Sequence, residues 1–117
     1  MNNLSPTVLA FDSGKVHMFD HIDSDGPMWS GSGKRLSRMT VRFDSPFQSP
    51  PAVQLSIAMI DADSGKNLRL EMSTEDLTTE GFTAVAHTWS DTRIGRLRLN
   101  WTAVGNRHAN VEPLWDV

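Results

Sequence analysis

The chain has 117 residues, of which 38% are hydrophobic, and it carries a formal net charge of −3 and no cysteine. This length is typical of one domain with a core of its own, and the lack of cysteine excludes thiol catalysis, thiolate metal ligands and disulfides. The acidic balance offers no basic field to a nucleic-acid partner, and no apolar run reaches the roughly 18 residues of a membrane-spanning helix.

The N-terminal part of the chain is predicted to form two short strands. Its first residues, MNNLSPTVLAFDSGK, lack the basic start and apolar core of a secretory signal. Residues 8–11 are an apolar run that predicts a strand, and Asp12-Ser13-Gly14 is typical of a turn. Residues 16–19 then continue as a second short strand.

A long loop is expected over residues 20–33, because the segment DHIDSDGPMWSGSG is rich in Asp, Gly, Ser and Pro. Loops of this length without structure of their own are usually functional or mobile. Its two large apolar residues, Met28 and Trp29, are expected to pin it to the body of the domain.

Alternation of apolar and polar residues predicts strands over residues 38–44, 53–59 and 68–72. Residues 45–51, SPFQSPP, form a connection or a sheet edge, since proline has no N–H to donate. Residues 61–67 are predicted to form a hairpin-like turn. The side chains expected to face inward are Met39, Val41, Phe43, Val53, Leu55, Ile57, Met59, Leu68, Leu70 and Met72.

Residues 81–105, GFTAVAHTWSDTRIGRLRLNWTAVG, are the most informative stretch, and they predict two strands joined by a polar turn. In the first strand, Phe82, Ala84 and Ala86 alternate with a second set that ends at His87 and Trp89. The second strand alternates in the same way. A tryptophan at the edge of a turn has little core to fill, which favours a role in binding or at an interface over plain packing.

Strands at short spacing, with polar turns and no helical period, predict an all-β fold, a small antiparallel β-sandwich of about six strands. We expect a single domain over residues 1–117, with residues 106–117 as a tail in which Trp115 could dock on the same chain or another. The side chains expected in the core are Val41, Phe43, Val53, Leu55, Ile57, Leu70, Leu97, Leu99 and Trp101.

The polar motifs do not predict catalysis or a cofactor. Asp61-x-Asp63-x-Gly65 resembles the start of a calcium loop, but Met72 stands where that loop needs a glutamate, so an ordinary turn is expected. The four histidines lack metal-ligand spacing, and the sequence holds no nucleophile or acid–base set, so we expect a protein that is not an enzyme. The outward arginines Arg38, Arg42, Arg96 and Arg98 indicate either a solvated face or a subunit interface.

These segments together resemble the H-type lectin domain, the family of the snail agglutinins and of the C-terminal domain of the discoidins. The resemblance covers residues 13–105, in order and with nearly constant spacing. The motifs that carry it are Ser13-Gly14-Lys15, Val41-x-Phe43-x-Ser45-Pro46-Phe47, Pro50-Pro51-x-Val53, Leu55-Ser56-Ile57, Asp61, Asn67-Leu68-Arg69, Gly81-Phe82, Thr88-Trp89-Ser90-Asp91-Thr92 and Trp101-x-Ala103-Val104-Gly105.

The resemblance implies a β-sandwich that assembles as a homotrimer or a stacked hexamer and binds galactose or N-acetylgalactosamine between neighbouring protomers, in an extracellular or cell-surface role. The residues implied in sugar binding are Ser30, Gly31, Ser32, Arg69, Trp89, Ser90 and Asp91. The chemistry of these residues agrees, because a sugar ring has an apolar face for a tryptophan and hydroxyls for Arg, Asp and Ser.

The sequence departs from the snail lectins at three sugar-contacting positions, where small residues stand at Ser32 or a neighbouring glycine, Ser90 and Gly95. Two functions therefore remain open. The first is a carbohydrate-binding module that is multivalent through oligomerisation. The second is a structural or assembly module that trimerises and keeps only a vestigial sugar site.

Overall fold

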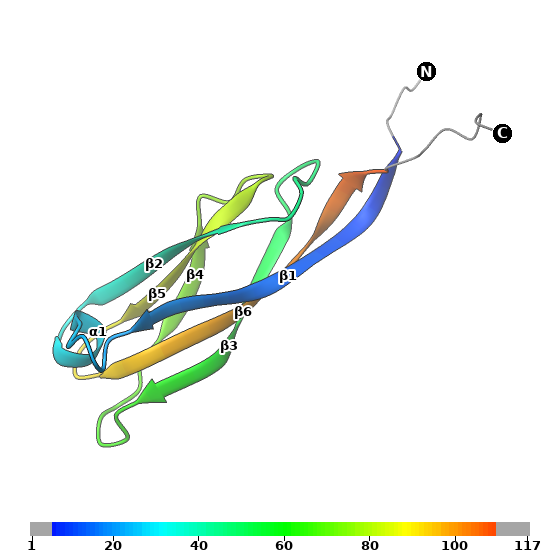
Figure 1. Cartoon of the computed structure of the whole chain (residues 1–117). Coiled ribbons are helices and arrows are strands. Elements are labelled where there is room, and N and C mark those ends of the chain that lie inside the picture. The colour runs from blue at the N-terminus through cyan, green and yellow to red at the C-terminus, as the bar shows by residue number, and fades with distance from the viewer. Residues whose placement is uncertain (1–5, 110–117) are drawn as a thin grey trace.

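The computed structural model describes residues 6–109, which form two packed antiparallel sheets (Figure 1). The predicted all-β sandwich is therefore confirmed. One sheet has the strand order β1-β6-β3 and the other β2-β5-β4. Within the described residues the elements are β1 (Thr7–Asp20), α1 (Pro27–Ser30), β2 (Arg35–Arg42), β3 (Ala52–Ala62), β4 (Glu71–Glu75), β5 (Gly81–Thr88) and β6 (Ile94–His108).

Most connections cross from one sheet to the other. Only β4 and β5 are consecutive in the chain and paired in one sheet, whereas β3 and β4 belong to different sheets. The hairpin expected at residues 61–67 is therefore wrong, although the local turn is present, with Gly65 N donating to Asp63 Oδ1 at 2.8 Å. Turn residues specify where the chain changes direction, but they do not specify which two strands pair with each other.

The turn predicted at Asp12-Ser13-Gly14 does not form, because β1 runs through it and pairs with β6 without interruption from Thr7 to His17. A Cβ added at Gly14 would lie 2.8 Å from the indole nitrogen of Trp101. The glycine therefore makes room for a core side chain. Asp12 likewise serves the strand, since its Oδ2 accepts the Asp44 amide at 2.9 Å.

The tail also begins later than expected. β6 continues to His108, so residues 106–108 are strand and pair with the start of β1. These ends of β1 and β6 extend beyond the rest of the sandwich as a two-stranded ribbon (Figure 1). Trp115 lies outside the described residues, so its docking stays a prediction.

The core lies between the sheets and is built around three aromatic rings. Phe43, Phe82 and Trp101 have centroids 5.7–5.9 Å apart. In β5 the side chains of Phe82, Ala84 and Ala86 are buried, and Val85 of the alternate set is buried as well. Of the predicted core residues, those that are buried are Val41, Phe43, Leu97, Leu99 and Trp101.

The core prediction is wrong for the edge strand β3 and for the segment before β4. Ile57 is 44% exposed and Leu68 is 57% exposed. Val53, Leu55 and Leu70 are only partly buried against the core. Their alternation is correct, but among residues 6–109 no neighbouring strand covers that edge of the sandwich.

The segment over residues 20–33 is more ordered than a plain loop, because it contains α1. Met28 is fully buried, and its amide donates to His21 Nδ1 at 3.2 Å. The Arg93 guanidinium lies 4.2 Å from the centre of the Trp29 ring. Both large side chains therefore hold the segment against the sandwich, as predicted. Within residues 6–109, no helix has the length and apolarity needed to cross a membrane.

The outward arginines are divided between the outer faces of the two sheets. Arg38 and Arg42 lie on β2, whereas Arg96 and Arg98 lie on β6 in the other sheet. Three of them have acidic partners: Arg38 with Glu75 at 2.9 Å, Arg42 with Glu80 at 3.7 Å and Arg96 with Asp61 at 3.0 Å. These exposed ion pairs offset the electrostatic repulsion between the two arginines of each face.

Candidate functional site

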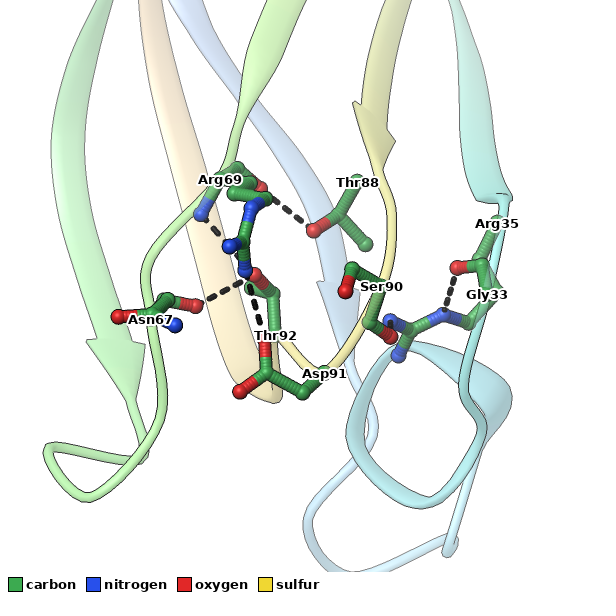
Figure 2. A network of polar contacts seen from close by, with 8 residues as sticks. All are labelled: Gly33, Arg35, Asn67, Arg69, Thr88, Ser90, Asp91 and Thr92. Atoms are coloured by element: carbon green, nitrogen blue, oxygen red, sulfur yellow. Dashed lines mark hydrogen bonds and ion pairs between the residues drawn. The ribbon is translucent and has the colours of Figure 1, made fainter.

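The candidate residues gather at the end of sheet β2-β5-β4, where β5 ends and the chain turns through residues 89–93 into β6 (Figure 2). In the pairing of β4 with β5, Glu71 lies opposite His87. Arg69 and Trp89 each lie two residues beyond this pair, just outside the paired strands. Both belong to the outward set, because Ala84 and Ala86 occupy the buried face of β5, and Trp89 is 36% exposed.

An ion pair joins Arg69 to the turn. Arg69 Nη1 lies 2.6 Å from Asp91 Oδ1, and both side chains are partly exposed. Partial desolvation raises the pKa of Asp91, but the hydrogen bond and positive charge of Arg69, together with hydrogen bonds to backbone at Asp91 and Asn67, hold that pKa below its ordinary value. The carboxylate at this position is therefore ionised at neutral pH.

Two buried threonine hydroxyls hold the backbone on which this ion pair sits (Figure 2). Thr88 Oγ1 donates to Arg69 O at 2.5 Å. Thr92 Oγ1 donates to Asn67 O at 2.5 Å and accepts the Arg69 amide at 3.0 Å. The sequence reasoning did not assign these roles. The only signal was a threonine on each side of the turn, a residue type that often bonds nearby backbone.

Ser90 gives the turn its shape. Its φ is 63°, in the left-handed region that residues other than glycine rarely adopt. Its carbonyl oxygen accepts the Gly33 amide at 2.9 Å. The contribution of Ser90 that the structure records is therefore made by its backbone, which joins the turn to the loop before β2.

The loop before β2 is held by hydrogen bonds to its own backbone carbonyls, which come from side chains as well as from amides. Ser30 Oγ donates to Asp25 O at 2.8 Å and to Gly26 O at 3.0 Å, so this predicted ligand hydroxyl is engaged inside the loop. The Gly31 amide donates to Pro27 O at 2.9 Å. Ser32 is exposed.

Arg35 is a further residue whose role the sequence does not indicate. Its guanidinium donates to five backbone carbonyls, at 2.9–3.3 Å. The accepting residues are Pro27, Met28, Gly31, Gly33 and Ser90. Burial lowers the pKa of Arg35 from its ordinary value. No motif marked this arginine, because its partners are carbonyls of a loop whose path the sequence does not reveal.

The turn separates the candidate residues into two groups in one chain. Arg69 and Asp91 lie toward β4, and we call them the arginine side. Ser30 to Gly33, with Arg35, lie toward β2, and we call them the loop side. Since β2 and β4 are the two neighbours of β5, the two sides lie on either side of Ser90 (Figure 2).

The surface next to the turn is aromatic. The rings of His87 and Trp89 lie 5.3 Å apart, tilted by 33°, and His87 Nδ1 lies 3.7 Å from Glu71 Oε1. An aromatic face beside a paired arginine and carboxylate can bind a ligand that has both an apolar face and hydroxyl groups. Within residues 6–109, no three His, Asp or Glu side chains are grouped as metal ligands.

Sequence comparison finds similar proteins over most of the described strands. The sequence profile of the H-type lectin domain matches residues 38–104. A protein of Fuscovulum blasticum named "ATP synthase subunits region ORF 7" is 40% identical over 93 residues, which cover 80% of this chain and 81% of that protein. Discoidin-2 of Dictyostelium discoideum is 29% identical over 99 residues, which cover 83% of this chain.

A solved structure is similar as well. The native structure of recombinant discoidin II from Dictyostelium discoideum superposes with a TM-score of 0.74 and 26% identity, over 92% of this chain. The chain spans 41% of that solved structure and 38% of the discoidin-2 sequence. It is therefore similar to less than half of the discoidin.

Proposed function

Since the chain belongs to the H-type lectin domain family, we propose that it binds glycans of galactose or N-acetylgalactosamine and that it does so as a multivalent homo-oligomer. The observation that carries this proposal is the ion pair of Arg69 with Asp91, a residue that follows the exposed Trp89 by two positions in the chain. These three side chains offer an apolar platform, a donor and an acceptor to a ligand at the turn.

The chemistry of a galacto-configured ring matches this surface. Its axial hydroxyl leaves a continuous C–H surface on the opposite face, which can lie on the Trp89 ring. Arg69 then donates to a ring hydroxyl or to an acetamide oxygen, while Asp91 accepts from a second hydroxyl. Hydrogen bonds to charged groups are the stronger kind and fix the orientation of the sugar.

Binding of one sugar is expected to be weak. Three positions that contact sugar in the snail lectins carry small residues here, and one of them is closed to ligand. A Cβ added at Gly95 would lie 2.2 Å from Ile22 Cγ1, so this position is filled by the chain's own loop. Several weak sites on one oligomer can still give strong overall binding, because each later contact becomes intramolecular. A homotrimer, alone or stacked as a hexamer, would supply such sites.

A glycan array on the pure protein tests the proposal. We expect signal on galacto-configured glycans and its loss in Trp89→Ala, whereas Leu9→Ala, an exposed position near the far end of β1, should bind like the parent. Failure of the parent to bind any such glycan, with its oligomer intact, would instead support the second function. In that case the domain is an assembly module, as the small residues at Ser32, Ser90 and Gly95 suggest.

A further inference from the structure

The two-stranded ribbon at the ends of β1 and β6 has an inner side that the rest of the sandwich covers only in part. The pairing of β6 with β3 ends at Val104, whereas its pairing with β1 continues through residues 105–108. Val8 lies opposite Arg107 in this ribbon, so their side chains share one side of it. Val8 belongs to the same alternating set as the buried Val16, yet it is 49% exposed.

A groove of about 580 Å³ lies between this end of the ribbon and the connection that follows β2. Its lining comes from residues 45–48, from Thr79 and from residues 107–109. Phe47 anchors the connection, since its side chain is buried and its amide donates to Thr79 O at 2.9 Å. The Arg107 guanidinium lies 4.2 Å from the centre of the Phe47 ring. The groove therefore has an apolar wall with a cation beside it.

Arg107 is incompletely matched by its neighbours. Its Nη2 donates to Ser45 O at 2.8 Å, but its ion pair with Asp12 is long, 3.6 Å. That carboxylate also accepts the Asp44 amide at 2.9 Å. The Nε of Arg107 is buried and has no hydrogen-bond partner within residues 6–109. The titratable residues that line the groove are Arg107 and His108, with no carboxylate, so the groove favours an acidic occupant.

We propose that this groove receives the C-terminal segment of the same chain, residues 110–117, which lies outside the described residues. Ala109 lines the groove and directly precedes this segment. The Ala109 amide donates to Pro6 O at 2.8 Å, so the segment starts from a hydrogen-bonded position at the groove itself. The six residues from Ala109 to Trp115 span about 20 Å when extended, which is enough to cross a groove of this volume.

The apolar residues of the segment suit the uncovered surface. Its sequence, NVEPLWDV, places Leu114 and Trp115 side by side. A tryptophan ring that lies over the inner side of the ribbon would bury Val8 and complete the core there. The other end of the chain is a poorer match, because residues 1–5, MNNLS, offer one leucine and no carboxylate.

The charges of the segment suit the groove as well. It contains Glu112 and Asp116 and no basic residue. A carboxylate from this segment can accept from Arg107 or His108, and hydrogen bonds between charged groups are the stronger kind. The contact lies at the opposite end of the sandwich from the turn over residues 89–93 (Figure 1). It is therefore separate from the proposed glycan site.

Fluorine NMR on the full chain, labelled with 5-fluorotryptophan, tests the contact. The chain has four tryptophans, and Trp115→Phe identifies the signal of Trp115. We expect this signal to shift as little between H₂O and D₂O as that of Trp101, which is 6% exposed. It should differ from the signal of Trp89, which is 36% exposed. A Trp115 signal as solvent-sensitive as free 5-fluorotryptophan would overturn the inference.

A charge placed in the groove supplies the second measurement. Gln48 is exposed and lines the groove, so Gln48→Glu competes for Arg107 and repels the acidic segment. The Trp115 signal should then become solvent-sensitive, while the Trp101 signal stays protected and shows that the core is intact. The matched control is Gln54→Glu, the same change at an exposed position of β3 opposite Thr102. It should leave the Trp115 signal as in the parent.

The remaining outcomes decide where the segment docks. A Trp115 signal that stays protected in Gln48→Glu, or that is released equally by Gln54→Glu, would place the segment elsewhere and overturn the inference. Labelled Gln48→Glu mixed with excess unlabelled parent should keep an exposed Trp115 signal. Recovered protection in that mixture would mean that the segment docks on a second copy, against the proposal. Binding to the glycan array should be the same in parent and Gln48→Glu, so this test stands apart from that of the glycan site.

Discussion

Arg69 and Asp91 form an ion pair of 2.6 Å between the segment that leads into β4 and the turn that follows β5. The two residues are 22 positions apart in the chain. The backbone of Arg69 is held by buried Thr88 and Thr92, so the geometry of the pair does not depend on two mobile side chains alone. Exposed ion pairs stabilise a fold by only about 0.2–1 kcal/mol. We therefore expect this pair to matter more for ligand binding than for stability.

The first prediction concerns Arg69→Ala. A lost hydrogen bond from a charged group costs about 1.5–3 kcal/mol, so affinity for a galacto-configured glycan should fall roughly 10- to 150-fold. Titration calorimetry measures this, and circular dichroism should show an unchanged fold. Arg98→Ala removes the same charge from the exposed face of the other sheet and should bind like the parent. Equal affinities for parent and Arg69→Ala would refute the assignment.

The second prediction concerns pH. Partial desolvation opposes the shift, but Arg69 and the backbone hydrogen bonds at Asp91 and Asn67 together lower the pKa of Asp91 from its ordinary 3.8. A carboxyl with a lower pKa in the folded state adds stability above its unfolded pKa, and that stability is lost as pH falls through the folded value. The stability difference between parent and Asp91→Asn, measured by urea unfolding, should therefore be present at neutral pH and shrink below about pH 4. A difference that stays constant down to about pH 2 contradicts this.

The strands could be predicted from the sequence because their alternation is strong. Period-2 alternation divides β5 into two sets but does not decide which is buried, because Val85 shares the set of Trp89; the structure buries Phe82, Ala84 and Ala86. At Asp12-Ser13-Gly14 the turn predicted from residue types is wrong. Residues typical of a turn form a strand there, because Gly14 admits the Trp101 indole and Asp12 accepts a backbone amide. Contacts with residues distant in the sequence therefore outweigh the turn propensity of these three residues.

The errors at the site have a different origin. Arg69 and Asp91 were named from the family resemblance, and the structure brings them together. Arg35 was missed because its five partners are backbone carbonyls, which have no sequence signature. Ile57 was placed in the core because alternation reports the face of a sheet but not whether a neighbour covers its edge. Exposure at an edge depends on topology and assembly.

The third prediction concerns the two buried threonines. Thr88→Val removes a hydroxyl at similar volume and leaves Arg69 O without its donor, and Thr92→Val does the same to Asn67 O. A buried polar group left without a partner costs about 1–3 kcal/mol. Urea unfolding should show this loss for each variant, together with weaker glycan binding. Thr102→Val, at an exposed position of β6, is the matched control and should change stability by less than about 0.5 kcal/mol.

The last prediction concerns Arg35, whose planar guanidinium joins the loop side to the turn. A lysine keeps the charge but has a single ammonium, which cannot reach five carbonyls at once. We therefore expect Arg35→Lys to release the loop from Ser90. The amide of Gly33, which donates to Ser90 O at 2.9 Å, reports this directly. Its deuterium exchange should become about tenfold faster, which corresponds to roughly 1.4 kcal/mol of easier local opening.

The neighbouring Lys34 supplies the control for this variant. Lys34→Ala changes an exposed residue of the same loop, and the Gly33 amide should exchange there as in the parent. In Arg35→Lys, amides of β5 such as that of Val85 should keep their protection, because the core between the sheets is untouched. Faster exchange throughout β5 would mean that Arg35 stabilises the whole sandwich. Unchanged exchange at Gly33 would mean that the amide of Gly33 holds the loop to the turn without the guanidinium.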